Sequence, residues 1–368
     1  MKESHKKISV FIPSLRGGGA ERMMLNLASE LRNKGEDVWL VVAQEESDYV
    51  VPDILSDRVT YLDVSRIRKS LFPLMRYLRR EKPDVLIATM THANGIAILA
   101  KVLSWSDTQI IIREANTLSE SVKGTTQTRR YVRLLVAFFF YWLADEIVAV
   151  SEGVANDLAN TAKLSRERIT VIRNPTITRA AIEKYQGTVT HPWFTDKKTP
   201  VILAVGRLHP QKDYPTLIRA FAHALKEREL RLVILGEGPD RRGLERYIVE
   251  LDVEKHVDVP GFVENPYAYM EQADLYVLSS RWEGLPNTLI EALGAGTPVV
   301  ATDCPSGPRE ILEDGRYGTL VPVGDPDALS EAMLEELSRS RSANFLREYA
   351  RTTFSAERAA SAYLSLIR

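Results

Sequence analysis

The sequence predicts an α/β protein of two domains, each with a parallel sheet covered by helices. Short apolar runs alternate with amphipathic helical patterns, which is the order of elements in parallel sheets. This alternation begins near the N-terminus and begins again after Pro200. A chain of 368 residues is also longer than one ordinary core accommodates, so two domains are expected.

The elements of the first domain follow in order. A helix is expected over 20–33, because Met24, Leu27, Ala28 and Leu31 share one face and Gly35 follows. Apolar runs predict strands at 8–12, 38–43, 85–89, 109–113 and 146–151.

In the second domain, strands are expected at 201–206, 232–236, 275–280 and 299–303, and helices at 214–226 and 241–251. The stretch from Asn174 to Pro200 has little periodicity and contains several prolines, so we place the junction there. The predicted domains are residues 1–175 and 176–368.

Composition limits the class of protein. Hydrophobic residues make up 45% and charged residues 26%, as in globular proteins. The one cysteine, Cys304, allows no intrachain disulfide and indicates a reducing compartment. The apolar run after the basic start is about one strand long and contains a proline, so no signal peptide is expected.

Charge is unevenly distributed. Residues 1–180 hold 26 basic and 21 acidic side chains, a net charge of +5, although the whole chain has −1. A basic half beside an acidic half indicates an anionic partner on one side only.

The most informative segment runs from Ser279 to Ala292. An apolar run precedes it, and Pro286 and Asn287 then begin a helix that ends near Gly296. Glu283 falls in the strand-to-helix loop, and Glu291 falls about one turn inside the helix. Because a helix N-terminus attracts anions, this arrangement suits a ligand with hydroxyls at both ends and phosphate between them.

Arg207 and Lys212 come directly after the strand at 201–206. Ligands of open α/β sheets bind at such strand ends, where two cations can hold a diphosphate. The alternative is a pair of solvated surface charges.

Three glycines, Gly17, Gly18 and Gly19, lie between the first strand and the first helix. They allow a close approach of backbone to ligand, or only a tight turn. Arg22 occupies the position where a dinucleotide loop requires glycine, which disfavours NAD.

Together these motifs resemble the retaining glycosyltransferases of family 4, which have the GT-B fold. The pattern Glu283-x7-Glu291 carries the resemblance, with Gly-Gly-Gly-Ala-Glu-Arg at 17–22, Val-Gly-Arg-Leu at 205–208, Gly-Glu-Gly-Pro at 236–239 and Pro-Ser-Gly-Pro-Arg-Glu at 305–310. Five motifs in family order cover nearly the whole chain.

The resemblance implies two Rossmann-like domains facing across a cleft, an acceptor-binding one at 1–175 and a donor-binding one at 176–368. It also implies that the last helix, about 355–368, crosses back to the first domain. As catalytic residues it implies Glu283, which would hold donor sugar hydroxyls, Arg207 and Lys212, and His92. The implied donor-binding residues are Gly17, Gly18, Gly19, Gly206, Gly284, Leu285, Pro286, Asn287, Thr288 and Glu291, the last for the ribose hydroxyls.

Weaker candidates follow two other strands. His92 lies in a predicted loop after the strand at 85–89. The resemblance to the family places it beside the donor sugar, and the alternative is an ordinary loop histidine. Arg113, Glu114 and Asn116 end another strand and are candidates for the acceptor side, although local turn hydrogen bonds explain them nearly as well.

Asp325-Pro326-Asp327 resembles an Asp-x-Asp metal motif. We interpret it as a helix start, with Asp325 as cap and Pro326 in the first turn. The resemblance implies that no metal is needed, because Arg207 and Lys212 take that role.

Two segments indicate an anionic membrane surface as partner. Arg66, Arg68, Lys69, Arg76, Arg79 and Arg80 alternate with apolar residues such as Phe72, and a basic run at 129–133 precedes the apolar run 134–143. A buried core helix is the stronger reading of 134–143, which is too short to span a bilayer.

The predicted function is that of a retaining glycosyltransferase, which moves a hexose or N-acetylhexosamine from a UDP-sugar to a glycan acceptor. This acceptor is expected to be lipid-linked. No other cofactor and no nucleic-acid partner are expected. The enzyme would be cytoplasmic and peripheral on the inner membrane face. A nucleotide-sugar epimerase would need an acid/base pair that we cannot single out, and a non-catalytic nucleotide-sugar-binding protein would usually lack Glu283, Arg207 or Lys212. The sequence does not name the sugar.

Overall fold

The chain forms two compact units, each built on a parallel sheet. Unit 1 comprises residues 1–175 and 356–368, and unit 2 comprises residues 176–355. The computed structural model describes residues 5–16, 18–45, 50–123 and 139–368. Across those ranges, no helix is both long and apolar enough to cross a bilayer.

The described part of unit 1 contains a seven-stranded sheet with strand order β3-β2-β1-β4-β5-β6-β7. Its strands are β1 Lys7–Ile12, β2 Asp37–Val42, β3 Val59–Tyr61, β4 Val85–Thr89, β5 Gln109–Glu114, β6 Glu146–Ala149 and β7 Ile169–Val171. Its helices are α1 Gly19–Asn33, α2 Leu71–Glu81, α3 Thr91–Ser104, α4 Leu118–Lys123, α6 Glu152–Ala162 and α16 Ala356–Leu364, with 3-10 helices at Asp53–Leu55, Ile67–Ser70, Tyr141–Leu143 and Arg166–Arg168.

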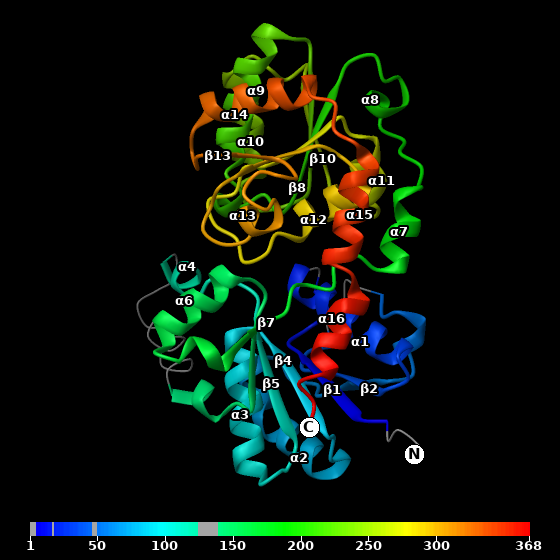
Figure 1. Ribbon diagram of the computed structural model, residues 1–368, viewed down its shortest axis with the longest axis vertical. Helices are drawn as coiled ribbons and strands as arrows, with labels where there is room; N and C mark the ends of the chain where they lie inside the picture. The colour runs from blue at the N-terminus through cyan, green and yellow to red at the C-terminus, as the bar shows by residue number, and fades with distance from the viewer. Residues whose placement is uncertain (1–4, 17, 46–49, 124–138) are drawn as a thin grey trace. The chain divides into compact units, whose positions relative to one another are not determined.

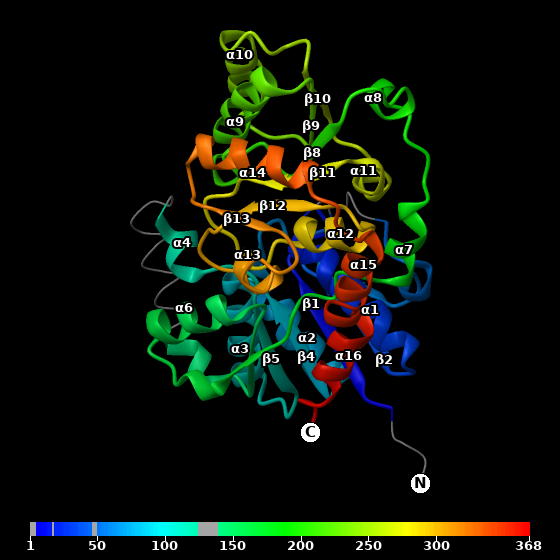
Figure 2. The same ribbon diagram turned by 45° about the horizontal axis from the view of Figure 1, so that its top comes forward.

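Helix α16 begins the C-terminal segment 356–368 that belongs to unit 1. It packs beside α1 (Figures 1 and 2). Ala359, Ala360 and Tyr363 contribute to the same buried cluster as the apolar face of α1 and the central strands β1 and β2. Burial of this face holds the last turns of the chain on the first sheet.

Unit 2 contains a six-stranded sheet with strand order β10-β9-β8-β11-β12-β13. Its strands are β8 Val201–Val205, β9 Arg231–Leu235, β10 Val257–Gly261, β11 Leu275–Leu278, β12 Val299–Thr302 and β13 Thr319–Val321. Its helices are α7 Arg179–Tyr185, α8 Pro192–Thr195, α9 Tyr214–Glu227, α10 Arg241–Glu250, α11 Pro266–Gln272, α12 Asn287–Ala295, α13 Pro308–Ile311, α14 Pro326–Ser338 and α15 Ala343–Thr353, with a 3-10 helix at Pro210–Lys212. Helices α7 and α8 lie in the stretch 174–200, where the sequence showed little periodicity.

All described strand pairs are parallel, and both sheets reverse their strand order once. In unit 1 the reversal lies between β1 and β4, and in unit 2 it lies between β8 and β11. The connections diverge at such a switch point, and ligands of open α/β sheets bind beyond the strand ends there. The loops after β8 and β11 are those that carry Arg207, Lys212 and Glu283.

Candidate functional site

The loop between β11 and α12 places Glu283 at the switch point of the unit 2 sheet. Helix α12 begins at Asn287, directly after Pro286, and ends at Gly296, whose φ of 85° is the left-handed conformation that glycine adopts without strain. Glu283 is 7% exposed. The local pattern that predicted a strand, a loop and a helix here is therefore confirmed.

Glu283 forms an ion pair with Lys212 across this loop. The distance between Lys212 Nζ and Glu283 Oε1 is 2.7 Å, and the side chains are 17% and 9% exposed. Ser280 Oγ donates to the same carboxylate oxygen at 2.7 Å. A charge pair that is this well buried is held in place by its hydrogen bonds, so the structure brings Lys212 and Glu283 together as one unit.

The two loops are also joined through their backbones. Ser279 Oγ donates to the Lys212 carbonyl at 2.7 Å, and the Arg281 amide donates to the Gln211 carbonyl at 2.8 Å. Gln211 Nε2 returns a bond to the Trp282 carbonyl at 2.8 Å. These bonds make the loops after β8 and β11 a single platform at the switch point.

Glycines allow this platform to pack closely. A Cβ at Gly206 would lie 2.9 Å from both Lys212 Cε and Tyr214 Oη. A Cβ at Gly236 would lie 2.0 Å from the Gly206 carbonyl oxygen, and one at Gly238 would lie 2.2 Å from that of Leu208. Residues 236–238 therefore press directly on the loop that carries Arg207 and Lys212. Arg207 itself is exposed.

A second loop, at 304–307, supports the turn at Gly284, Leu285 and Pro286. Ser306 Oγ donates to the Gly284 carbonyl at 2.8 Å, and the Glu283 amide donates to the Pro305 carbonyl at 3.1 Å. Gly307 has φ of 97°, and a Cβ there would lie 2.5 Å from Pro286 Cδ. The motif at 305–310 thus holds the Glu283 loop in shape.

The predicted ribose contact, Glu291, lies deeper than its sequence position indicated. Its side chain has no exposed surface, and Tyr267 Oη donates to Glu291 Oε1 at 3.4 Å. On the first turn of the same helix, Asn287 Oδ1 accepts from Thr176 and Thr288 Oγ1 accepts from Tyr276. Burial gives Glu291 a role inside the unit, and the ribose contact stays a prediction.

In unit 1, the glycine loop leads into α1 as expected, although Gly17 lies outside the described residues. Gly18 is the residue before the helix, which begins at Gly19. A Cβ at Gly18 would lie 2.0 Å from Glu21 Oε2, and Glu21 is 7% exposed. The Glu21 carboxylate therefore folds back toward the helix start, where a negative charge is stabilised.

The strand ends β4 and β5 lead to a buried polar network around Glu114. Its carboxylate accepts hydrogen bonds from Asn94 Nδ2 at 3.0 Å, from Thr91 Oγ1 at 3.3 Å and, at short range, from the Tyr141 hydroxyl. Burial raises the pKa of Glu114 to about 7, against the opposing effect of these hydrogen bonds. The network holds the first turn of α3, where His92 is exposed.

Arg113 also points into unit 1. It is 2% exposed and donates to Thr89 Oγ1 at 2.8 Å and to Asn174 Oδ1 at 2.5 Å. Burial lowers its pKa. Arg113 and Glu114 are therefore almost fully buried and anchor the loops, and their place on the acceptor side stays a prediction. Of the three predicted acceptor residues, only Asn116 is exposed.

Several residues of these networks were not predicted: Ser280, Asn94 and Tyr141. No motif marks them, because hydroxyl and amide side chains near strand ends are common. Their roles appear only when the loops after different strands come together. Buried polar groups require partners, and that requirement identifies them in the structure.

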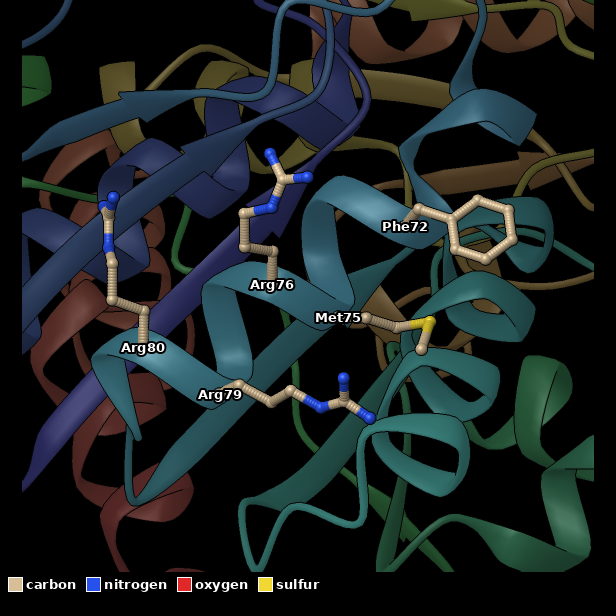
Figure 3. Close-up of a pocket in the computed structure, with 5 residues that line it drawn as sticks. All are labelled: Phe72, Met75, Arg76, Arg79 and Arg80. Atoms are coloured by element: carbon tan, nitrogen blue, oxygen red, sulfur yellow. The ribbon is translucent and has the colours of Figure 1, made fainter.

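Helix α2 carries three arginines of the basic cluster predicted to meet a membrane, and Arg66, Arg68 and Lys69 lie just before it, at the 3-10 helix Ile67–Ser70. Phe72, Met75, Arg76, Arg79 and Arg80 line a pocket on its exposed face (Figure 3). Phe72 is 73% exposed. Figure 3 shows Arg76 and Arg80 on one side of the helix and Met75 and Arg79 on the other. Arg79 also donates hydrogen bonds to the carbonyls of Leu103 and Ser104, which lie at the C-terminal end of α3.

The second predicted membrane segment is only partly described. The basic run 129–133 and residues 134–138 of the apolar run lie outside the described residues. At the end of that run Tyr141 is buried, whereas Trp142 and Leu143 are 51% and 52% exposed.

Asp325 caps helix α14, as predicted. Its side chain accepts from the amides of Asp327 at 3.1 Å and Ala328 at 3.0 Å. Asp327 is paired with His223 at 2.8 Å. Both carboxylates of the Asp-x-Asp pattern are therefore used by local structure.

Comparison with known proteins gives two adjoining family matches. Residues 17–179 match the model of Glycosyltransferase Family 4, and residues 190–353 match the model of Glycosyl transferases group 1. A curated relative from Campylobacter jejuni is 30% identical and is named N-acetylgalactosamine-N,N'-diacetylbacillosaminyl-diphospho-undecaprenol 4-alpha-N-acetylgalactosaminyltransferase. The match covers 89% of each chain. A lipopolysaccharide core biosynthesis glycosyltransferase from Rhizobium meliloti is 26% identical over 96% of each chain.

Solved structures agree in fold. HepE from Anabaena, solved with UDP and glucose, has a TM-score of 0.79 at 21% identity and covers 98% of this chain and 99% of its own. A sucrose-phosphate synthase from Thermosynechococcus elongatus has a TM-score of 0.81 at 18% identity, with 98% of each chain covered. The GT-B class predicted from the sequence is confirmed.

Proposed function

Because this chain belongs to the glycosyltransferases of family 4 and group 1, we propose that it transfers a hexose or N-acetylhexosamine from a UDP-linked sugar with retention of configuration. The acceptor is a lipid-linked glycan in bacterial polysaccharide or glycoconjugate assembly. The donor binds at the switch point of the unit 2 sheet. The acceptor binds on unit 1.

One observation carries this proposal: Lys212 and Glu283 share a platform at that switch point, with Arg207 exposed on the same loop as Lys212. During transfer, the bond from the anomeric carbon to the diphosphate oxygen breaks, and its electron pair stays on the oxygen. The cations of Lys212 and Arg207 stabilise that growing negative charge more than the charge of the bound donor, which lowers the barrier. Glu283 accepts hydrogen bonds from sugar hydroxyls and positions the ring.

Retention follows if the acceptor hydroxyl attacks from the face that the diphosphate leaves. The oxygen of that hydroxyl forms the new bond to the anomeric carbon. Its proton passes to the departing phosphate oxygen, so no protein base is needed. The products are the glycosylated acceptor and UDP.

A lipid-linked acceptor is supported by two kinds of observation. The Campylobacter jejuni relative is named for a diphospho-undecaprenol substrate, and the exposed face of α2 carries arginines beside Phe72. We propose that this face docks on the anionic inner surface of the cytoplasmic membrane, where such acceptors are presented.

The test is a donor screen. The protein is incubated with UDP-, GDP- and ADP-linked hexoses and N-acetylhexosamines, with and without an undecaprenyl-diphosphate-linked acceptor, and nucleotide release is measured. We expect UDP release that depends on the acceptor, and an α-linked product by NMR from an α-linked donor. A β-linked product would overturn retention, and release from GDP- or ADP-sugars alone would overturn the assignment of UDP.

The same screen separates the alternatives. A nucleotide-sugar epimerase would release UDP or convert the UDP-sugar without any acceptor. A non-catalytic nucleotide-sugar-binding protein would bind the donor and release nothing. Either result would replace the glycosyl transfer proposed for this site.

A further inference from the structure

Tyr214 carries a buried hydroxyl that the fold of unit 2 does not use. It is the first residue of α9, two positions after Lys212, and it is 3% exposed. Among the described residues, its hydroxyl has no hydrogen-bond partner. Burial raises the pKa of Tyr214 well above the usual range, so the hydroxyl keeps its proton. A buried polar group without a partner costs free energy and requires an explanation.

Packing alone does not explain the hydroxyl. The ring belongs to the buried core of unit 2, and phenylalanine would fill the same space without a polar atom to desolvate. Other tyrosines of unit 2 use their hydroxyls, such as Tyr349, which donates to the Ile311 carbonyl at 2.7 Å, and Tyr276, which donates to Thr288 at 2.7 Å. Tyr214 therefore differs from its neighbours in lacking a partner within the fold.

The surroundings of the hydroxyl indicate what it serves. Tyr214 Oη and Lys212 Cε both lie 2.9 Å from the point where a Cβ on Gly206 would stand. The two side chains thus flank the same glycine, and the charge of Glu283 also acts on Tyr214. The Lys212 ammonium has three N–H donors, of which the structure shows one directed to Glu283 Oε1.

We propose that Tyr214 is a positioning residue for Lys212, and that its hydroxyl accepts an N–H of Lys212 when the ammonium turns toward the donor diphosphate. The hydrogen bond fixes the direction of the remaining N–H groups at the breaking bond. This inference rests on the proposed function, because it assigns Lys212 to the diphosphate. Glycine at 206 is needed because a larger residue would separate the two side chains.

The test is Tyr214→Phe, with Tyr349→Phe as the matched control. Tyr214→Phe removes a hydroxyl without a partner, so we expect the Tm to stay equal or rise. Turnover should fall about tenfold or more, because a hydrogen bond to a charged group is lost in the transition state. The loss should lie mainly in kcat, with KM little changed. Tyr349→Phe removes a bonded hydroxyl that lies outside the two loops of the platform, so its Tm should fall and its turnover should stay within twofold.

Two results would overturn the assignment. If a buried water satisfies Tyr214, Tyr214→Phe would lower the Tm as Tyr349→Phe does. If turnover of Tyr214→Phe stays within twofold of wild type, the hydroxyl has no part in the reaction.

A double mutant tests whether Tyr214 acts through Lys212. In a Lys212→Ala background, Tyr214→Phe should cost no further turnover, because the partner is already gone. A full tenfold loss in that background would show that Tyr214 acts independently of Lys212. If wild type releases no UDP from any donor, the proposed function has failed. If wild type is active and Tyr214→Phe equals it, only the positioning role has failed.

Discussion

The strand-end loops of the two units use glutamate in opposite ways. In unit 2, Glu283 faces the cation of Lys212, and part of both side chains reaches the surface. In unit 1, Glu114 is 4% exposed and faces the neutral donors of Thr91, Asn94 and Tyr141. Glu114 is the last residue of β5, and Glu283 lies in the loop after β11, so the same residue type at the carboxyl end of two parallel strands has two different roles.

This difference shows that the role of a buried carboxylate depends on whether its hydrogen-bond partners are charged or neutral. A carboxylate beside a lysine keeps a charged pair at the platform, which can be rearranged around a charged ligand. A carboxylate among hydroxyl and amide donors loses more to desolvation than it gains, and its pKa rises. We therefore expect changes in unit 2 loops to act on turnover, and changes in the Glu114 network to act on stability.

The largest effect is expected from removing the cations of unit 2. Lys212→Ala or Arg207→Ala should lower turnover on the order of 10²-fold or more, because each removes a charge that stabilises the leaving diphosphate. The measurement is the steady-state rate of UDP release. Arg242→Ala, on the exposed surface of α10, is the charge-matched control and should keep wild-type turnover. Turnover within twofold of wild type in both site variants would remove the diphosphate assignment.

The Glu114 network should make the stability of the folded protein depend on pH. The pKa of Glu114 is raised to about 7 in the folded protein from 4.5, so the unfolded chain releases this proton at lower pH than the folded one. Stability contributed by the protonated form is therefore present below about pH 4.5 and is lost as pH rises toward 7. A shift of this size corresponds to about 3 kcal/mol.

The measurement is urea unfolding of wild type and Glu114→Gln from pH 5 to pH 8. The variant cannot ionise at this position, so its stability relative to wild type should increase with pH and level off above pH 7. Glu357→Gln, an exposed change on α16, is the control and should show no such trend. Parallel pH curves for wild type and Glu114→Gln would mean that Glu114 is ionised across this range.

The sequence predicted the fold class and the central strands because those strands are apolar on both faces and long enough to be recognised. The edge strands β3, β7, β10 and β13 were missed. In β10, Asp258 and Pro260 interrupt the apolar run. Strands β3, β7 and β13 have three residues each, too few for any pattern. Helices α7 and α8 were missed for the same reason, since seven and four residues show little helical period.

The site was predictable where a motif marks it. Spacing placed Arg207 and Lys212 after one strand and Glu283 after another strand of the same domain, and the structure shows that these strands, β8 and β11, are neighbours. Spacing could not show that Arg113 and Glu114 turn inward, because a polar residue at a strand end can face either way. Nor could it find Ser280 or Tyr214, whose importance depends on atoms from another loop.

Loss of the basic cluster should have a smaller effect, and it should act on membrane binding. This prediction extends the comparison of the two units to their surfaces. Changing the exposed residues Arg66, Arg68 and Arg76 to Ser removes three charges that contribute about 1 kcal/mol each near an anionic surface. Co-sedimentation with liposomes that contain anionic lipid should fall at least tenfold, and wild-type binding should weaken as salt rises.

The matched control changes Arg219, Arg242 and Arg246 in unit 2 to Ser, which removes the same charge from the acidic half. Its liposome binding should equal that of wild type. Equal binding of wild type to neutral and anionic liposomes, or equal loss in both triple variants, would make the basic cluster at 66–80 an ordinary solvated face.

The smallest effect concerns Asp325. Its substitution tests whether this carboxylate of unit 2 has only a structural role, in contrast to Glu283 at the platform. Asp325→Ala removes the cap of α14 and should cost about 1 kcal/mol of stability, with turnover unchanged at a temperature where the variant is folded. Because Arg207 and Lys212 supply the positive charge, EDTA should leave turnover unchanged in wild type and variant alike. Activity that disappears with EDTA and returns with Mg²⁺ or Mn²⁺ would assign the diphosphate to a metal ion. If that response were lost in Asp325→Ala alone, Asp325 would be one of its ligands.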